Sequence, residues 1–219
     1  EYKMGNSIIH AVNGVDLSIG RGEFVAIIGP SGSGKSTMMN LVGALDFATT
    51  GDIFLDNVNI EHLEESDLAQ LRGKKIGFIF QTFNLIPTLT ALENVTLPMI
   101  FQGVAKETRG ERAENLLKSV GLFSRITHKP KEMSGGEQQR VAFARSLANN
   151  PEIILADEPT GNLDSKTGQE IMDLLVSLHK KEYKTIIMVT HDMHLVKHAD
   201  KVVRMKDGEI VKIETLNGE

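Results

Sequence analysis

The residues from Gly29 to Thr37 have the spacing of a loop that binds phosphate. Their sequence, Gly-Pro-Ser-Gly-Ser-Gly-Lys-Ser-Thr, fits the pattern G-x-x-x-x-G-K-[ST]. Glycines let such a loop turn its backbone N–H groups inward, toward phosphate oxygens. Lys35 would bring a positive charge to the β- and γ-phosphates, and the Ser36 hydroxyl would ligate Mg²⁺. The pattern predicts a nucleoside triphosphate site whose contacts are Gly29, Ser31, Gly32, Ser33, Gly34, Lys35, Ser36 and Thr37.

Two neighbouring acids, Asp157 and Glu158, follow the apolar run of residues 153–156. Asp157 has the place of the strand-end acid that binds Mg²⁺ in enzymes with this kind of phosphate loop. Successive side chains of an extended chain point to opposite sides, so Glu158 is expected to face a water that it orients and deprotonates. Two acids after a strand also fit a turn or a helix cap, and it is the phosphate loop that favours catalysis.

Two further polar residues follow apolar runs: Gln81 comes after residues 76–80, and His191 after residues 186–190. Ligands of open α/β sheets bind outside the carboxyl ends of the strands, so we expect both residues to converge on the same γ-phosphate. Gln81 would contact Mg²⁺ or its water, and His191 would donate to a phosphate oxygen. The predicted Mg²⁺ ligands are Ser36, Gln81 and Asp157, and the predicted catalytic residues are Lys35, Gln81, Glu158 and His191.

A second helix start that suits an anion lies at Ser134-Gly135-Gly136-Glu137. Ser134 and Glu137 also satisfy a capping box, so one interpretation is simply a well-capped helix. However, two glycines at a helix start are unfavourable in backbone entropy, and a capping box does not need them. They favour a close approach of backbone N–H groups to an anion. A simple kinase with one phosphate loop would not need this second helix start.

These residues must be positioned by alternating strands and helices. The four runs expected to be buried strands are 24–28, 76–80, 153–156 and 186–189. Apolar residues at helical spacing indicate helices around 38–45, 113–120 and 171–178, and another is expected from 134 to about 148. The alternation implies an α/β fold with a mostly parallel sheet.

Two stretches depart from that alternation. Residues 53–57 and 202–213 are typical of antiparallel pairs with tight turns. The long interval from about residue 83 to 150 holds helical patterns and no convincing strand, which predicts a helical subdomain inserted into the α/β core.

Composition is that of an ordinary globular protein, with 41% hydrophobic and 24% charged residues. The absence of cysteine excludes disulfides, thiolate metal sites and cysteine nucleophiles. The formal net charge of -5 disfavours general nucleic-acid binding. The apolar runs are too short for a membrane span and no secretory signal is visible, so we expect a cytosolic protein. Since the chain begins with Glu1, we expect it to start inside the natural sequence.

The ordered motifs resemble the nucleotide-binding domain of ABC transporters, over nearly the whole chain. The matching segments are Gly29–Thr37 (Walker A), Gln81 (Q-loop), Ser134-Gly135-Gly136-Glu137-Gln138 (signature), Ile153–Glu158 (Walker B), Asn162-Leu163-Asp164 (D-loop) and His191 (switch). Tyr2 has the position of the aromatic residue that stacks on adenine. The signature differs from the commonest form at Met133 and Glu137. Residues 81–95 and 157–164 look like the lipoprotein-release, macrolide-export and cell-division ATPases of this family.

The resemblance implies a single ABC ATPase domain over residues 1–219, with a P-loop NTPase core. Its RecA-like core and antiparallel β part would be residues 1–82 and 150–219, and its helical signature subdomain residues 83–149. It implies ATP and Mg²⁺ as cofactors and an ATP-dependent, head-to-tail homodimer. Each ATP would lie between the Walker A loop of one copy and the signature of the other, with Asp164 among the nucleotide contacts.

The same resemblance implies a separate transmembrane permease as partner and a cytoplasmic location on the inner face of the cell membrane. Residues 83–87 are expected either to help dock that permease or to belong to the subdomain core. The competing hypothesis is a non-transport ABC ATPase acting on nucleic acid or ribosomes. The missing coiled coil, the single cassette and the acidic balance disfavour it. A P-loop kinase would leave the two glycines unexplained.

Overall fold

The computed structural model describes residues 1–4 and 7–216 of the chain. In chain order, its strands are β1 (Tyr2–Met4), β2 (Ser7–Ile9), β3 (Phe24–Ile28), β4 (Phe54–Leu55), β5 (Val58–Asn59), β6 (Ile76–Ile79), β7 (Ile153–Asp157), β8 (Thr185–Val189), β9 (Lys201–Lys206) and β10 (Glu209–Thr215). Its α-helices are α1 (Lys35–Val42), α2 (Glu65–Lys75), α3 (Ala91–Phe101), α4 (Lys106–Ser119), α5 (Gly135–Ser146), α6 (Ser165–Glu182) and α7 (Met193–Val196). Short 3₁₀ turns lie at Ile60–His62, Phe123–Arg125 and Pro130–Glu132.

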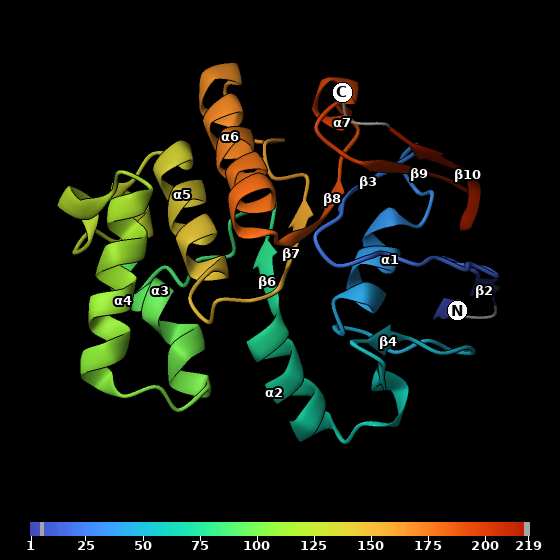
Figure 1. Cartoon of the computed structure of the whole chain (residues 1–219), viewed down its shortest axis with the longest axis horizontal. Helices are drawn as coiled ribbons and strands as arrows, with labels where there is room; N and C mark the ends of the chain where they lie inside the picture. Colours follow the sequence, from blue (N-terminus) through green and yellow to red (C-terminus); the bar gives the residue numbers. More distant parts are fainter. Residues whose placement is uncertain (5–6, 217–219) are drawn as a thin grey trace.

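A mostly parallel sheet forms the centre of the molecule (Figure 1). It has six strands in the order β10-β9-β3-β8-β7-β6, and all neighbours from β9 to β6 are parallel. Only β10 is antiparallel to its neighbour. All four predicted buried strands are present in this sheet. Because β3, β6, β7 and β8 run in the same direction, the segments that follow them leave from one edge of the sheet.

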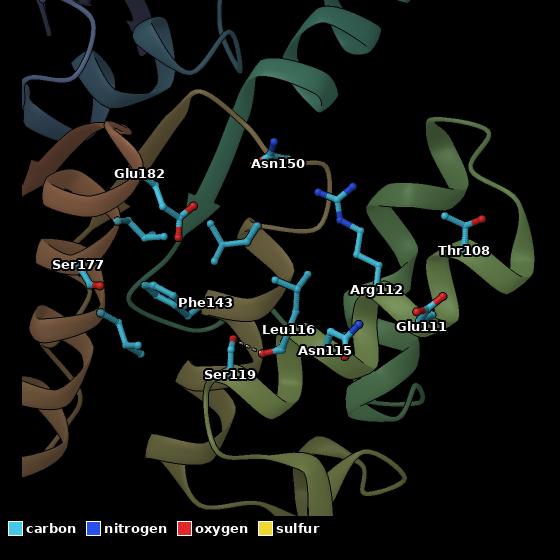
Figure 2. A pocket seen from close by; sticks show the side chains of 13 residues that line it. Thr108, Glu111, Arg112, Asn115, Leu116, Ser119, Phe143, Asn150, Ser177 and Glu182 are labelled. Carbon is cyan, nitrogen blue, oxygen red and sulfur yellow. Dashed lines mark hydrogen bonds between the residues drawn. The ribbon is translucent and has the colours of Figure 1, made fainter.

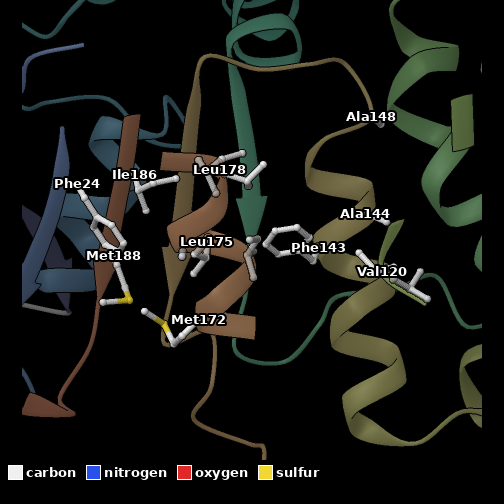
Figure 3. Packing of buried hydrophobic residues seen from close by; sticks show 14 of the residues in the cluster. Phe24, Val120, Phe143, Ala144, Ala148, Met172, Leu175, Leu178, Ile186 and Met188 are labelled. Atoms are coloured by element: carbon white, nitrogen blue, oxygen red, sulfur yellow. The ribbon is translucent and has the colours of Figure 1, made fainter. Parts of the chain in front are cut away.

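The sheet is covered on both faces, which explains why its strands are continuously apolar. Alternate residues of β3 belong to two different core clusters, with Phe24 in one and Val25 in the other. The first cluster contains buried residues of α6 and α5 such as Leu175 and Phe143 (Figure 3). The second contains Met38 and Met39 of α1. Helices α1 and α6 therefore pack on opposite faces of the sheet.

Both predicted antiparallel pairs are present. The pair β4–β5 turns at Asp56 and Asn57, which have φ of 51° and 64°. Short polar residues tolerate this left-handed conformation, and it suits a two-residue hairpin turn. The pair β9–β10 turns in the same way at Asp207 and Gly208. A further antiparallel pair, β1–β2, lies at the N-terminus, and sequence patterns did not predict it.

The segment between β6 and β7 is helical, with α3, α4 and α5 packed on one another. Helix α3 begins at a capping box in which Thr90 and Glu93 exchange hydrogen bonds. Figure 1 shows this helical segment to one side of the sheet, beyond α6 and away from α1. Among the described residues, no strand interrupts it.

Several element bounds differ from the predicted ones. Helix α1 ends at Val42 because Gly43 follows, and Leu45 lies outside it. Helix α5 ends at Ser146 rather than near residue 148. Strand β6 ends at Ile79, one residue early, and β4 holds only two residues. None of these differences moves a predicted site residue to another edge of the sheet.

Candidate functional site

The predicted residues of one half of the site lie together at the carboxyl edge of the sheet. The phosphate loop follows β3, Gln81 follows β6, Glu158 follows β7 and His191 follows β8. These strands are adjacent in the order β3-β8-β7-β6, so the four segments emerge side by side. The edge therefore brings a glycine-rich loop, two acids, an amide and an imidazole to one place.

The phosphate loop needs glycine at positions where the chain bends sharply or approaches another segment. Gly32 and Gly34 have φ of 77° and 95°, which L side chains rarely adopt. A Cβ added at Gly34 would lie 2.1 Å from the carbonyl oxygen of Ala11. One added at Gly29 would lie 2.2 Å from the carbonyl oxygen of Met205. The loop is thus pressed against two neighbouring segments that fix its shape.

Lys35, the first residue of α1, is buried and reaches back over the loop. Its Nζ donates to the carbonyl oxygens of Gly29, at 2.9 Å, and Pro30, at 2.8 Å. The hydroxyl of Ser33, itself buried, lies 3.4 Å from the same nitrogen. The ammonium group is therefore held within the loop, where it can approach a phosphate that the loop binds.

The start of α1 leaves its first N–H groups available for an anion. In the described part of the chain, no side chain caps this helix, and its first turn holds no acidic residue. The unpaired N–H groups and the helix dipole favour negative charge at this point. Ser36 is exposed here, so its hydroxyl can reach a ligand.

The two acids after β7 have different surroundings. Burial raises the pKa of Asp157, the charge of Glu158 raises it further, and Lys35 opposes both effects. Glu158 leaves the strand with φ of 43°, a conformation that non-glycine residues seldom adopt. Its Oε1 lies 3.0 Å from Nδ1 of His191. The structure therefore joins the predicted base and the predicted phosphate donor in one contact.

Gln81 is held beside the turn that follows Glu158. Its backbone carbonyl oxygen accepts a hydrogen bond of 3.0 Å from the side-chain amide of Asn162. A Cβ added at Gly161 would lie 2.8 Å from the Gln81 amide nitrogen, so the glycine makes room for this side chain. The amide of Gln81 is thus placed against the segment that carries the acids.

The donors at this edge fit Mg²⁺. The carboxylate of Asp157, the hydroxyl of Ser36 and the amide oxygen of Gln81 are hard oxygen ligands, which Mg²⁺ prefers. Within residues 1–4 and 7–216, no group of three or more His, Cys, Asp or Glu side chains could hold a metal by itself. Mg²⁺ in phosphate-loop sites is bound by one or two carboxylates together with substrate phosphates, so one acid suffices.

Tyr2 lies near the phosphate-loop helix. Its hydroxyl donates to Oδ2 of Asp46 at 2.6 Å, and this bond is the main reason that the Tyr2 pKa is raised. The ring is 40% exposed and, with Thr37, lines a groove of about 1140 Å³. The partner Asp46, which sequence patterns did not suggest, fixes the edge of the ring and leaves the ring available for stacking.

The second predicted helix start has the expected capping box. The backbone N–H of Ser134 donates to Oε2 of Glu137 at 2.8 Å, and the backbone N–H of Glu137 donates to the Ser134 hydroxyl. Arg125 donates to the other carboxylate oxygen of Glu137 at 3.1 Å. The N–H of Ser134 and the charge of Arg125 lower the pKa of Glu137. Ser134 and Gly135 are exposed and can meet a second molecule.

The packing around Gly135 and Gly136 differs. A Cβ added at Gly136 would lie 2.6 Å from Cγ2 of Thr167, so α5 and α6 approach closely here. Asp164 caps α6 and also accepts from the Thr167 hydroxyl at 2.7 Å. A Cβ added at Gly135 would meet only the Phe83 ring, at 3.7 Å. Close packing therefore explains Gly136 without an anion, whereas it explains Gly135 poorly.

The two helix starts that are predicted to bind anions belong to different parts of the molecule. Helix α1 packs on β7 and β8, whereas α5 packs on α3, α4, α6 and β6. Figure 1 shows α5 and α1 on opposite sides of α6 and the central strands. The phosphate loop and the predicted signature of one chain therefore lie on different sides of α6 (Figure 1).

Several residues that support the site could not be found from sequence patterns. Gln139 of α5 is fully buried and donates to the Pro159 carbonyl oxygen at 2.6 Å, next to the acid pair. Arg125 and Asp46 are the others already described. The only sequence signal they carry is a polar residue beside a motif, which is too common to be informative.

A separate cavity of about 690 Å³ lies between α4, α5 and α6 (Figure 2). Phe143 of α5 is among the residues that line it, and Arg112 of α4 and Glu182 of α6 lie on opposite sides of it. No predicted site residue lines this cavity, so it is separate from the predicted nucleotide site.

Residues 12–161 match the ABC transporter family. Among similar proteins is the ABC transporter ATP-binding protein MJ0796 of Methanocaldococcus jannaschii, 53% identical over 99% of this chain and 94% of that protein. The macrolide export ATP-binding/permease protein MacB of Vibrio parahaemolyticus is 50% identical over the whole chain, which spans 33% of that protein.

Solved structures agree with this result. A dimeric structure of MJ0796 in a post-hydrolysis state, bound to ADP and Pi, covers 100% of this chain and 96% of its own, with a TM-score of 0.93 and 51% identity. The predicted fold class is thereby confirmed. None of the helices in the described residues is long and apolar enough to cross a membrane.

Proposed function

The chain belongs to the ABC transporter family as one of its ATP-binding, ATP-hydrolysing subunits, and from this premise we propose how its residues act and with what it assembles. The proposal is that two copies pair head to tail and hold two ATP molecules between them. The observation that carries it is the separation of two anion-binding helix starts on different parts of one chain. Each ATP then needs both copies.

Lys35 and the N–H groups of the phosphate loop would bind the β- and γ-phosphates. Lys35 already lies within that loop, where it contacts the Gly29 and Pro30 carbonyl oxygens. Asp157, Ser36 and Gln81 would hold Mg²⁺, which when bound neutralises phosphate charge. The Tyr2 ring, anchored at its edge by Asp46, would stack on the adenine. The residues proposed to make nucleotide contacts from the partner copy are Ser134, Gly135, Gly136 and Glu137, with Asp164 near the interface.

Glu158 would be the base that takes a proton from the attacking water. Its contact with His191 Nδ1, at 3.0 Å, orients the carboxylate and keeps its other oxygen available. His191 would then direct its second ring nitrogen toward the γ-phosphate. The left-handed backbone of Glu158, with φ of 43°, turns the side chain out of the strand direction toward that partner. This arrangement supports hydrolysis by an in-line water.

Hydrolysis would open the pair. The γ-phosphate is the anion that attracts the signature N–H groups, and its release removes that attraction. The pair thus converts nucleotide state into opening and closing. We propose that a separate transmembrane permease receives this movement, which places the chain in the cytoplasm at the inner face of the cell membrane. Residues 83–149 would be the moving helical part, and residues 1–82 and 150–219 the nucleotide-binding part.

This function is tested by two measurements on the purified protein. Mg²⁺-dependent release of phosphate from ATP is expected, together with a shift from monomer to dimer during gel filtration with an ATP analogue that cannot be hydrolysed. A protein that releases no phosphate would contradict the proposed ATPase. Affinity purification of this chain from mildly detergent-treated membranes is expected to recover a permease with it. Recovery of the chain without any permease would contradict the membrane partner.

Replacing Ser134 by arginine is expected to spare ATP binding and to abolish hydrolysis. The added cation and bulk would occupy the place of the partner's γ-phosphate, while the phosphate loop is unchanged. We expect at least about a hundredfold loss of ATPase activity, the size of effect that misplaced transition-state contacts produce. Nucleotide affinity of the monomer, measured by titration calorimetry, should remain within about twofold. A variant with normal activity would contradict the role of the signature.

A further inference from the structure

Arg145, near the end of α5, reaches the segment that follows Gln81. Its Nη2 donates to the Phe83 carbonyl oxygen at 2.8 Å, and its Nη1 donates to the Asn84 carbonyl oxygen. The side chain is partly buried, and burial lowers its pKa. A guanidinium group that is removed from water needs such acceptors, and two neighbouring carbonyl oxygens suit its planar fork.

The backbone that Arg145 contacts has an unusual conformation. Phe83 and Asn84 have φ of 59° and 50°, so two consecutive non-glycine residues are left-handed. Asn tolerates this region, but a bulky aromatic residue rarely adopts it. Such strain persists where surrounding contacts hold it, and it is concentrated at functional sites. The N–H groups of Phe83 and Asn84 donate within the turn, to the carbonyl oxygens of Phe80 and Thr82, and the paired hydrogen bonds from Arg145 hold the carbonyl groups of both residues from outside it.

The same segment also contacts the other end of α5. The Phe83 ring lies 3.7 Å from the position that a Cβ on Gly135 would take. Helix side chains point back toward the N-terminus, so Arg145 and the Phe83 ring together can span most of α5. On its other side, the segment is fixed by Asn162, whose amide donates to the Gln81 carbonyl oxygen at 3.0 Å.

We propose that Arg145 is a positioning residue for ATP hydrolysis, because it ties the segment after Gln81 to the helix that begins at the signature. Through these contacts, the position of the Gln81 side-chain amide in one nucleotide site is coupled to the position of Ser134 in the other site. The inference rests on the proposed function of these two residues. Arg145 lies outside every motif named above. Its contacts connect the part of the chain that carries Gln81 with the part that carries the signature.

Arg145→Ala is expected to lower kcat for ATP hydrolysis at least about tenfold while KM and the ATP affinity of the monomer stay within about twofold. The phosphate loop, which carries the binding, is not contacted by Arg145. The matched control is Arg109→Ala. Arg109 is a partly buried helical arginine that donates to the Val104 carbonyl oxygen at 3.0 Å, away from Gln81. Equal kcat in the two variants would overturn the proposal.

Two measurements separate positioning from general support of the fold. Millimolar guanidinium chloride should restore part of the lost kcat of Arg145→Ala, because a free guanidinium ion can donate to both carbonyl oxygens; it should not change Arg109→Ala. Hydrogen exchange of residues 81–90 should be faster in Arg145→Ala and unchanged in Arg109→Ala. Absence of both effects would overturn the proposal.

Arg145→Lys covers the case in which the alanine variant does not fold. A lysine keeps the charge but cannot form the same planar pair of hydrogen bonds, so we expect kcat between those of the wild type and the alanine variant. A fully active lysine variant would contradict the proposal that hydrolysis depends on the paired hydrogen bonds of the guanidinium group. The exchange measurement needs no ATP, so it tests the tie even if the wild-type protein released no phosphate, a result that would instead contradict the proposed ATPase.

Discussion

Glu158→Gln is expected to bind ATP normally and to hydrolyse it about a thousandfold more slowly than the wild type. General bases contribute roughly 10²–10⁴-fold to rates, and the amide of glutamine cannot accept the proton of the attacking water. The substitution keeps the length of the side chain and its contact with His191, which lies 3.0 Å away. Binding should therefore survive, because the phosphate loop and Asp157 are unchanged.

The same variant should accumulate as an ATP-bound dimer, since the γ-phosphate that joins the copies is no longer removed. Gel filtration with light scattering in the presence of ATP measures the mass directly. Glu182→Gln is the matched control, because Glu182 is exposed on the last turn of α6 and lines the separate cavity between α4, α5 and α6. A Glu158→Gln protein that stays monomeric at saturating ATP would contradict the shared site.

Lys35→Ala is expected to weaken ATP binding at least about a hundredfold, or about 2.7 kcal/mol. The variant loses the positive charge at the β- and γ-phosphates. It also loses the hydrogen bonds from Nζ to the Gly29 and Pro30 carbonyl oxygens, at 2.9 and 2.8 Å, so the loop itself is less ordered. Titration with a fluorescent ATP analogue measures the change in affinity.

Lys118→Ala controls for the loss of one positive charge, because Lys118 is exposed on α4, away from the nucleotide site. Its ATP affinity should equal that of the wild type. If Lys35→Ala binds ATP as tightly as this control, the glycine-rich loop is not the nucleotide site.

Most of the fold could be predicted because the sheet is buried on both faces. Its strands are then continuous apolar runs, and polar side chains at their ends are conspicuous. Glu158 and His191 were placed at one edge by that reasoning, and the structure brings them into contact. The short N-terminal strand pair β1–β2 was not predicted, because three-residue strands carry too little periodicity to be recognised.

The supporting contacts of the site could not be predicted, for two physical reasons. Backbone conformation is invisible in residue types: nothing in the sequence indicates that Glu158 and Phe83 have φ of 43° and 59°. Contacts between distant segments depend on packing, so the pairing of Arg125 with Glu137, or of Arg145 with the Phe83 carbonyl oxygen, follows only from the folded chain. Gly136 illustrates a further ambiguity, because its proximity to Thr167 gives it a packing role beside the predicted anion-binding role.

Mixing two inactive variants tests the shared site most directly. Lys35→Ala has a defective phosphate loop and an intact signature, whereas Ser134→Arg has the reverse. In a head-to-tail pair of one copy of each, both defects meet in one site, and the other site is wholly intact. If the sites act independently and pairing is random, an equimolar mixture should regain about a quarter of the wild-type ATPase rate, since half of the pairs are mixed and each has one working site. A mixture as inactive as either variant alone would contradict an ATP held between two copies.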